Sequence, residues 1–224
     1  MVQFIDSELL LLRKEIGEMW TVVYNQLDRA CESVLTFDKE LAQQVLVRER
    51  RVNAFELKID SEVEDMIALY TPAGIDLRFA LAIFKMNTNL ERLGDFAKGV
   101  ARFTLSCEAG DVDADLLSSL RLQDMATRLL SMLETTKCAL EEENIEKATS
   151  VFAMDTLVDE IDEASNLILA QYLAKHPESA LVCLNLSNVF RKLERAGDHI
   201  TNIAEEIIFY VDAKVVKHSK SAGE

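Results

Sequence analysis

Apolar residues recur every three or four positions along almost the whole chain, and this spacing limits its fold more than any other feature. From Leu9 to Val34 they form one stripe that continues over about seven helical turns. A second stripe runs from Leu41 to Tyr70. The 224 residues include only 7 glycines and 2 prolines, which is too few for the many turns of a sheet-rich fold. The sequence therefore predicts an all-α protein built from long helices.

Turn-forming residues divide the first half of the chain into three helices. The segment Thr36–Asp38 interrupts the first stripe, and the segment Thr71–Gly74 ends the second, because proline cannot continue a helix. The third helix is predicted to run from about Asp76, as its N-cap, to about Thr104. Residues 108–115 hold three aspartates and little apolar content, so we place the boundary between two halves there.

The second half repeats this plan. We predict one helix over Ala114–Glu143 and another from the N-cap Asn144 to about Lys175. The last helix is predicted to start at His176-Pro177, since proline suits the first helical position, and to end near Val211.

Long helices with short connections pack as antiparallel bundles. The sequence therefore predicts six long helices in two tandem, pseudo-repeated, antiparallel three-helix bundles, at residues 1–107 and 114–213. A flexible tail is expected over residues 214–224. One continuous six-helix bundle and a spectrin-like rod are the alternatives.

The net charge of −15 excludes some classes of function. A surface with 39 acidic and 24 basic residues repels phosphate backbones, which argues against nucleic-acid binding. The longest run without a charged residue, Ser179–Phe190, is shorter than the roughly 20 residues that a membrane span needs. The N-terminus shows no export signal, and the four cysteines form no CxxC pair. We expect a cytoplasmic protein with reduced thiols and no membrane span.

A six-residue motif occurs twice. Leu90–Asp95 reads LERLGD and Leu193–Asp198 reads LERAGD, and each copy falls in the third helix of its half, which indicates an internal duplication. In each copy the glutamate and the aspartate are four residues apart, so their carboxylates lie on one helix face and repel each other. The glycine costs roughly another 1 kcal/mol of helix stability. A bound cation would offset the repulsion, and close approach of a helix or a ligand would explain the glycine.

The preceding helix of each half carries a matching pair of oxygen-bearing side chains, which are Glu49 with Asn53 and Asp155 with Asp159. A further acid follows each pair, Glu56 in the first half and Asp162 in the second. Antiparallel helices pack about 8–10 Å apart, so the pairs of adjacent helices converge. Oxygen-rich clusters bind magnesium, manganese, calcium, iron or zinc ions. The sequence therefore predicts a metal site in each half, with the candidate ligands Glu49, Asn53, Glu91, Asp95, Asp155, Asp159, Glu194 and Asp198.

The two predicted sites differ in charge. The second has four carboxylates, whereas Asn53 replaces one of them in the first, so we expect weaker metal binding at the first site. His199, beside Asp198, is expected to pack or to support a ligand rather than to bind metal itself. The alternative to metal binding is a solvated acidic face on which Arg92 and Arg195 pair across helices.

The sequence resembles the PhoU family over about residues 4–213. The matching residues include Leu9, Leu12, Arg13 and Lys14 in the first helix, the segment Asp76–Phe79, and the motif Leu90–Asp95. The most specific match is Leu193–Glu205, which reads LERAGDHITNIAE. Asn53 and Asn89 depart from the family pattern, in which aspartate is usual before the first motif, and both departures weaken the first site.

The resemblance implies two similar three-helix bundles whose repeated E/DxxxD motif binds metal clusters, with iron or zinc in relatives. It also implies a cytoplasmic, often dimeric negative regulator of the phosphate regulon. Such a protein links the ATPase of the phosphate ABC transporter to the phosphate-sensing histidine kinase and limits phosphate uptake. No catalytic reaction or catalytic residue is implied.

Two other functions are compatible with the residues. One is a carboxylate-bridged di-metal oxidase or hydrolase, although ferritin-like sites use Glu-x-x-His and no histidine here has a glutamate three residues before it. The other is a plain helical scaffold whose acidic faces bind no specific metal.

Overall fold

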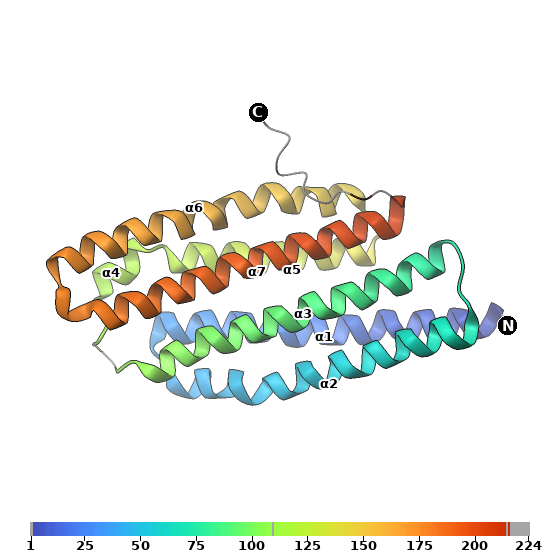
Figure 1. The fold of residues 1–224 in the computed structure, drawn as a ribbon, viewed down its shortest axis with the longest axis horizontal. Helices are drawn as coiled ribbons and strands as arrows, with labels where there is room; N and C mark the ends of the chain where they lie inside the picture. The colour runs from blue at the N-terminus through green and yellow to red at the C-terminus, as the bar shows by residue number, and fades with distance from the viewer. Residues whose placement is uncertain (1, 109, 214, 216–224) are drawn as a thin grey trace.

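The computed structural model describes residues 2–108, 110–213 and 215 (Figure 1). All regular structure within these residues is helical, which confirms the all-α prediction. The long helices are α1 (Val2–Thr36), α2 (Lys39–Tyr70), α3 (Ile75–Ser106), α5 (Leu122–Glu141), α6 (Ile145–Lys175) and α7 (Ala180–Asp212). A short helix, α4 (Ala114–Ser119), precedes α5, and a 3₁₀ turn, η1 (Pro177–Ser179), precedes α7. The predicted flexible tail over 214–224 lies outside the described residues, apart from residue 215.

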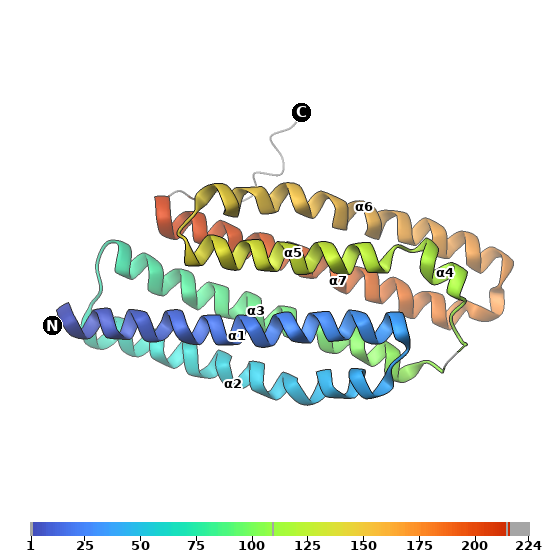
Figure 2. The same ribbon diagram turned by 180° about the vertical axis from the view of Figure 1, so that it is seen from behind.

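The long helices run side by side along the molecule (Figures 1 and 2). Helices α1, α2 and α3 pack on one another, as do α5, α6 and α7. Helix α3 packs against α7 and α1 against α5, whereas α2 and α6 lie at opposite edges (Figure 1). The buried side chains of both halves form one continuous core, and its largest members include Trp20, Phe79 and Phe190. The division of the chain into two domains stays a prediction.

Local side-chain chemistry sets several helix ends. Asp38 caps α2 and Asn144 caps α6, each by accepting a hydrogen bond of 2.9 Å from the backbone N–H three residues on. The prediction of Asn144 as an N-cap is thereby confirmed. The prediction of Asp76 as an N-cap is wrong, because Gly74 holds that position with a φ of +60°. Asp76 lies instead in the first turn of α3, where its negative charge suits the helix dipole.

The prediction of one helix over Ala114–Glu143 is also wrong, because the chain breaks after Ser119. Arg121 has a φ of +57°, in the left-handed region, and α5 starts directly after it. Leu120 and Leu122 on either side are each only 1% exposed. Two residues that are two positions apart on a straight helix point about 200° apart, so the break is what lets both leucines reach the core.

The last helix begins after a 3₁₀ turn rather than at His176-Pro177. Pro177 opens η1, where its missing N–H is not needed, and α7 starts at Ala180. Helix α7 ends at Asp212, close to the predicted end. None of the helices in the described ranges is apolar over enough of its length to cross a membrane.

Polar side chains join the two halves within this packing. Trp20 Nε1 on α1 donates to the carbonyl oxygen of Leu133 on α5 at 3.1 Å, although the ring itself is buried. Lys85 Nζ on α3 lies 2.9 Å from a carboxylate oxygen of Glu206 on α7. Leaving a buried polar group without its hydrogen-bond partner destabilises the folded state. These contacts therefore favour one alignment of the two halves along the helix axes.

Candidate functional site

The two copies of the motif occupy equivalent positions on α3 and α7, facing α2 and α6. A Cβ atom on Gly94 would lie 3.2 Å from Val52 Cγ1, and one on Gly197 would lie 3.4 Å from Val158 Cγ1. The Cβ on Gly197 would also overlap a carboxylate oxygen of Asp155. Both glycines therefore mark the close approach of a neighbouring helix, which is one of the two explanations that the sequence left open.

In the first half, the structure brings the predicted residues Glu49 and Asp95 together around a lysine. Lys98 Nζ lies 2.5 Å from Glu49 Oε1 and 3.7 Å from Asp95 Oδ1. Asn53 Nδ2 donates to the same Glu49 oxygen at 3.2 Å. Hydrogen bonding to Lys98 is the main reason why the pKa of Glu49 is lowered. We call the boundary between α2 and α3 that carries these residues and Glu91 the first seam.

Glu91 lies among acids and beside one cation in the first seam, since Arg92 Nε is 3.6 Å from its Oε2. Burial raises the pKa of its carboxyl, and the charges of Asp95 and Glu56 raise that pKa further. Burial and then the charge of Asp60 raise the pKa of Glu56 in turn. Asp60 also accepts a hydrogen bond from Asn87 at 2.8 Å. The cluster of acids is therefore larger than the predicted ligand set.

In the second half, the predicted residues lie along the boundary between α6 and α7, which we call the second seam. Asp155 is fully buried beside Gly197, whereas Asp159 and Asp198 are exposed. The side chain of Glu194 is 20% exposed, and its Oε2 is buried without accepting a hydrogen bond. The Arg191 Nε atom lies 4.0 Å from that oxygen.

The acids of the second seam act on one another electrostatically. Burial raises the pKa of Glu194, and the charges of Asp198, Asp162 and Asp159 raise it further. Burial also raises the pKa of Asp162, and the charge of Asp159 raises that pKa further. Four carboxylates from two helices thus share one repulsive field, and a cation between them would be stabilised.

The duplicated positions differ in one respect that the sequence analysis missed. Thr201 follows Asp198 by three residues, as Lys98 follows Asp95, and its hydroxyl donates to the Asp198 carbonyl oxygen at 2.8 Å. The first seam therefore has an internal ammonium group at a position where the second seam has a neutral hydroxyl. The signal was available as the spacing of three residues from Asp95, which allows an ion pair along a helix.

Within the part of the chain that the structure describes, no group of three or more His, Cys, Asp and Glu side chains is spaced to hold a metal ion as it stands. The predicted ligands line seams rather than enclose a cage. The donor set of the second seam still fits a hard or borderline cation, because it consists of carboxylate oxygens and includes the buried Glu194 Oε2. In the first seam, the Lys98 ammonium takes the place between Glu49 and Asp95.

His199 lies between the two halves. Its Nδ1 is 2.7 Å from Asn89 Oδ1 on α3, and its ring is tilted against Phe96 at 5.4 Å between centroids. The Arg195 guanidinium lies over the same Phe96 ring, 5.0 Å from its centre. Burial and the Arg195 charge lower the pKa of His199, so the ring is neutral at pH 7. These contacts agree with the packing role expected from the sequence.

Comparison with known proteins gives a consistent result. A family model described as the PhoU domain matches the chain over residues 16–104 and 122–207. The phosphate-specific transport system accessory protein PhoU homolog of Pseudomonas aeruginosa is 31% identical over 217 residues, covering 96% of this chain and 88% of that protein. Homolog 1 of Thermotoga maritima is 28% identical, covering 95% of this chain and 90% of that protein.

Solved structures are similar over nearly the whole chain. The crystal structure of PhoU from Pseudomonas aeruginosa gives a TM-score of 0.84 at 29% identity, over 93% of this chain and 99% of that one. The phosphate transport system regulatory protein PhoU from Streptococcus pneumoniae gives a TM-score of 0.85 at 26% identity, over 95% and 99%. The arrangement of helices in this chain is therefore that of these proteins.

The close approach at the second motif can be tested by adding a methyl group. Gly197→Ala is expected to lower the free energy of unfolding by up to about 2 kcal/mol, since overpacking costs about 1–3 kcal/mol and alanine regains only about 1 kcal/mol of helix propensity. Gly17→Ala is the control, because no atom lies within 4 Å of its added Cβ, and it should stabilise the protein by about 1 kcal/mol. Urea denaturation measures both. Equal shifts in the same direction would contradict the proposed close contact.

The repulsion in the second seam predicts a pH-dependent effect of Glu194→Gln. The raised pKa of Glu194 means that the folded state holds its proton more tightly, so this group lowers stability as the pH rises above about 4.3. At pH 7 the variant should be more stable than the wild type by roughly 0.5 kcal/mol or more, the size of one like-charge pair on a helix. The difference should vanish towards pH 4.

Thermal melts between pH 4 and pH 8 measure this difference. Glu163→Gln is the matched control, because Glu163 is an exposed acid of α6 and its replacement changes the net charge by the same amount. A gain at neutral pH that is as large for Glu163→Gln as for Glu194→Gln would show that only the overall charge matters.

Proposed function

Because this chain belongs to the PhoU family, we propose that it is a non-catalytic accessory protein that regulates phosphate uptake and the response to phosphate starvation. The observation that carries the proposal is the match of the family model to both halves of the chain. The names of the relatives support it, since they are accessory proteins of phosphate-specific transport systems.

The proposal includes specific partners. The chain would bind the ATPase of a phosphate ABC transporter and a phosphate-sensing histidine kinase in the cytoplasm, and would hold the kinase in its repressing state when phosphate is plentiful. It would act as a homodimer. The long, rigidly packed helices support such a role, because they present extended faces for docking.

We propose that the second seam also binds a metal ion. Asp159, Glu194 and Asp198 would hold it with support from Asp162, and iron or zinc are the first candidates, with magnesium, manganese and calcium as alternatives. A bound cation would neutralise part of the repulsion among these carboxylates and would tie α6 to α7. Binding at the first seam is expected to be weaker, because a metal there would compete with the Lys98 ammonium for Glu49 and Asp95.

The regulatory function is tested by complementation. In a bacterium that lacks its own PhoU protein, this chain should restore repression of a phosphate-starvation reporter at high phosphate. The purified chain should also retain the kinase and the transporter ATPase in a pull-down. Normal reporter repression without either interaction would point to another route, and the absence of both repression and capture would refute the proposed function.

The metal proposal is tested separately by calorimetric titration and elemental analysis. The double variant Glu194→Gln/Asp198→Asn should lose most of the bound iron or zinc, by at least about tenfold in affinity, since it removes two carboxylate ligands. The equivalent variant Glu91→Gln/Asp95→Asn should lose less, and Glu163→Gln should lose none. Identical metal binding by all four proteins would mean that the seams are only solvated acidic surface.

A further inference from the structure

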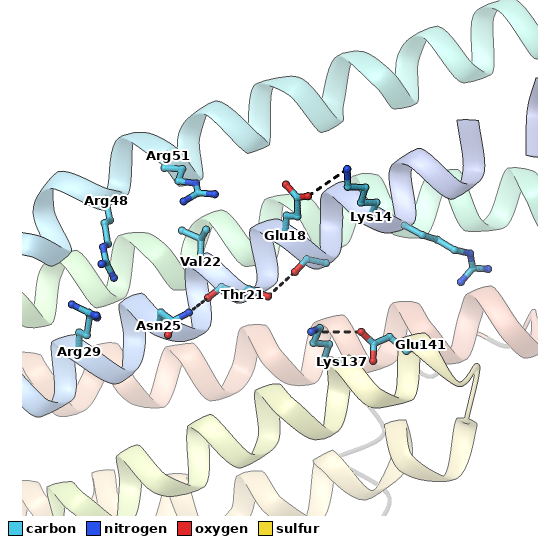
Figure 3. A pocket seen from close by; sticks show the side chains of 12 residues that line it. Lys14, Glu18, Thr21, Val22, Asn25, Arg29, Arg48, Arg51, Lys137 and Glu141 are labelled. Carbon is cyan, nitrogen blue, oxygen red and sulfur yellow. Dashed lines mark hydrogen bonds and ion pairs between the residues drawn. The ribbon is translucent and has the colours of Figure 1, made fainter. Parts of the chain in front are cut away.

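A basic trough lies on the side of α1 that faces away from the seams. It has a volume of about 670 Å³ and is bordered by α2 on one side and α5 on the other (Figure 3). Six cationic side chains line it, together with the two carboxylates Glu18 and Glu141. The cations are Arg13, Lys14, Arg29, Arg48, Arg51 and Lys137. This local excess of positive charge contrasts with the net charge of −15 for the whole chain.

Half of these cations already have partners in the fold. Arg13 Nη2 donates to a carboxylate oxygen of Glu143 at 2.8 Å and to the Tyr210 hydroxyl at 2.7 Å. Lys14 lies 3.8 Å from Glu18, and Lys137 lies 3.5 Å from Glu141. Each of these three cations is therefore already paired with a carboxylate, and two of the three pairs lie within a single helix.

The remaining three, which we call the arginine triad, have no such partners. None of Arg29, Arg48 and Arg51 forms an ion pair with a carboxylate anywhere in the described residues. Arg29 Nη1 donates to the neutral Gln44 side chain at 2.5 Å, and the Arg51 guanidinium lies 5.7 Å from the Phe55 ring centre. Figure 3 shows the triad at one end of the trough, with Arg29 on α1 opposite Arg48 and Arg51 on α2.

Three like charges at one end of the trough repel one another, and no carboxylate within the described residues forms an ion pair with them. Planar guanidinium groups match the oxygens of phosphate groups, which accept from several of their N–H donors at once. An anion at this end of the trough would therefore be bound by charge-assisted hydrogen bonds from two helices.

The rest of the trough indicates what kind of anion it would be. Val22 is the one hydrophobic side chain among its lining residues, so the trough has no cluster of hydrophobic side chains to hold an apolar anchor of a protein segment. Along α1 the trough extends from the triad to Lys14, which is about 22 Å at 1.5 Å per residue. That length exceeds a single phosphate ion. A chain of adjacent phosphate groups would place charge at the triad and continue towards Lys137.

We propose that the trough binds an anion that carries adjacent phosphate groups, with the arginine triad holding one end of the phosphate chain. Inorganic polyphosphate and the triphosphate of a nucleotide share this chemistry. This site is separate from both seams, and the proposal does not depend on the proposed regulatory function.

Isothermal titration of the full chain with tripolyphosphate, ATP and orthophosphate tests the proposal. A chelator in the buffer prevents a metal in the seams from binding the phosphates. Tripolyphosphate should bind with a 1:1 stoichiometry and at least tenfold more tightly than orthophosphate. Equal affinities for tripolyphosphate and ATP would show that the phosphate chain alone is recognised, and tighter binding of ATP would show that the nucleoside contributes.

The variants connect binding to the triad. Arg48→Gln/Arg51→Gln should weaken tripolyphosphate binding at least tenfold, while Arg50→Gln, an exposed arginine of the same helix that does not line the trough, should leave it unchanged. The double variant Arg48→Lys/Arg51→Lys keeps the charge and should give an intermediate affinity. Circular dichroism confirms that each variant is folded.

Three results would overturn the proposal. The first is the absence of binding by both tripolyphosphate and ATP at millimolar concentration. The second is an equal loss of affinity in Arg50→Gln and Arg48→Gln/Arg51→Gln. The third is tighter binding of a glutamate-rich peptide than of either phosphate ligand, which would assign the trough to an acidic protein segment. Unchanged phosphate binding by Glu194→Gln/Asp198→Asn would separate this site from the second seam.

Discussion

The packing of α3 and α7 against each other and against α2 and α6 positions both copies of the duplicated motif. Helix α3 contacts α7 on one side and α2 on another, and α7 contacts α6 in the same way. The side that meets α2 or α6 has room only for a glycine, at Gly94 and Gly197. Glu91 and Glu194, three residues before each glycine, are therefore held at the boundary between two helices, where they are largely withdrawn from water and close to other acids. The seams follow from the helix packing.

The two seams show how a duplicated structure can diverge through one residue. Lys98 supplies an ammonium group to Glu49 and Asp95, and this internal cation stabilises these two carboxylates. Thr201 at the equivalent place cannot do so, and the pKa of Glu194 is raised by its neighbours. In both seams neighbouring acids raise the pKa of a glutamate, but the first seam has an ammonium group between two of its acids where the second has a neutral hydroxyl.

Most of the fold could be predicted because helical periodicity and turn residues act locally. Asn144 caps α6 through a neighbour three residues away, so its role is visible in the sequence. The break at Arg121 contains neither glycine nor proline, and its cause is the demand of the distant core for both Leu120 and Leu122. Likewise, the motif predicted which acids converge, but the full burial of Asp155 depends on packing against α7, which the sequence alone does not give.

The arginine triad could not be predicted, because its members come from two helices that are brought together only by folding. The net negative charge of the chain also gives no indication of a local basic surface. Their placement makes α2 the helix on which both kinds of charge meet. Glu49 reaches towards α3 and Lys98, while Arg48, its neighbour in sequence, reaches towards α1 and Arg29 (Figure 3). Because both side chains extend from one continuous helix, a shift of α2 relative to α1 and α3 changes the cation contact of the first seam and the spacing of the triad together.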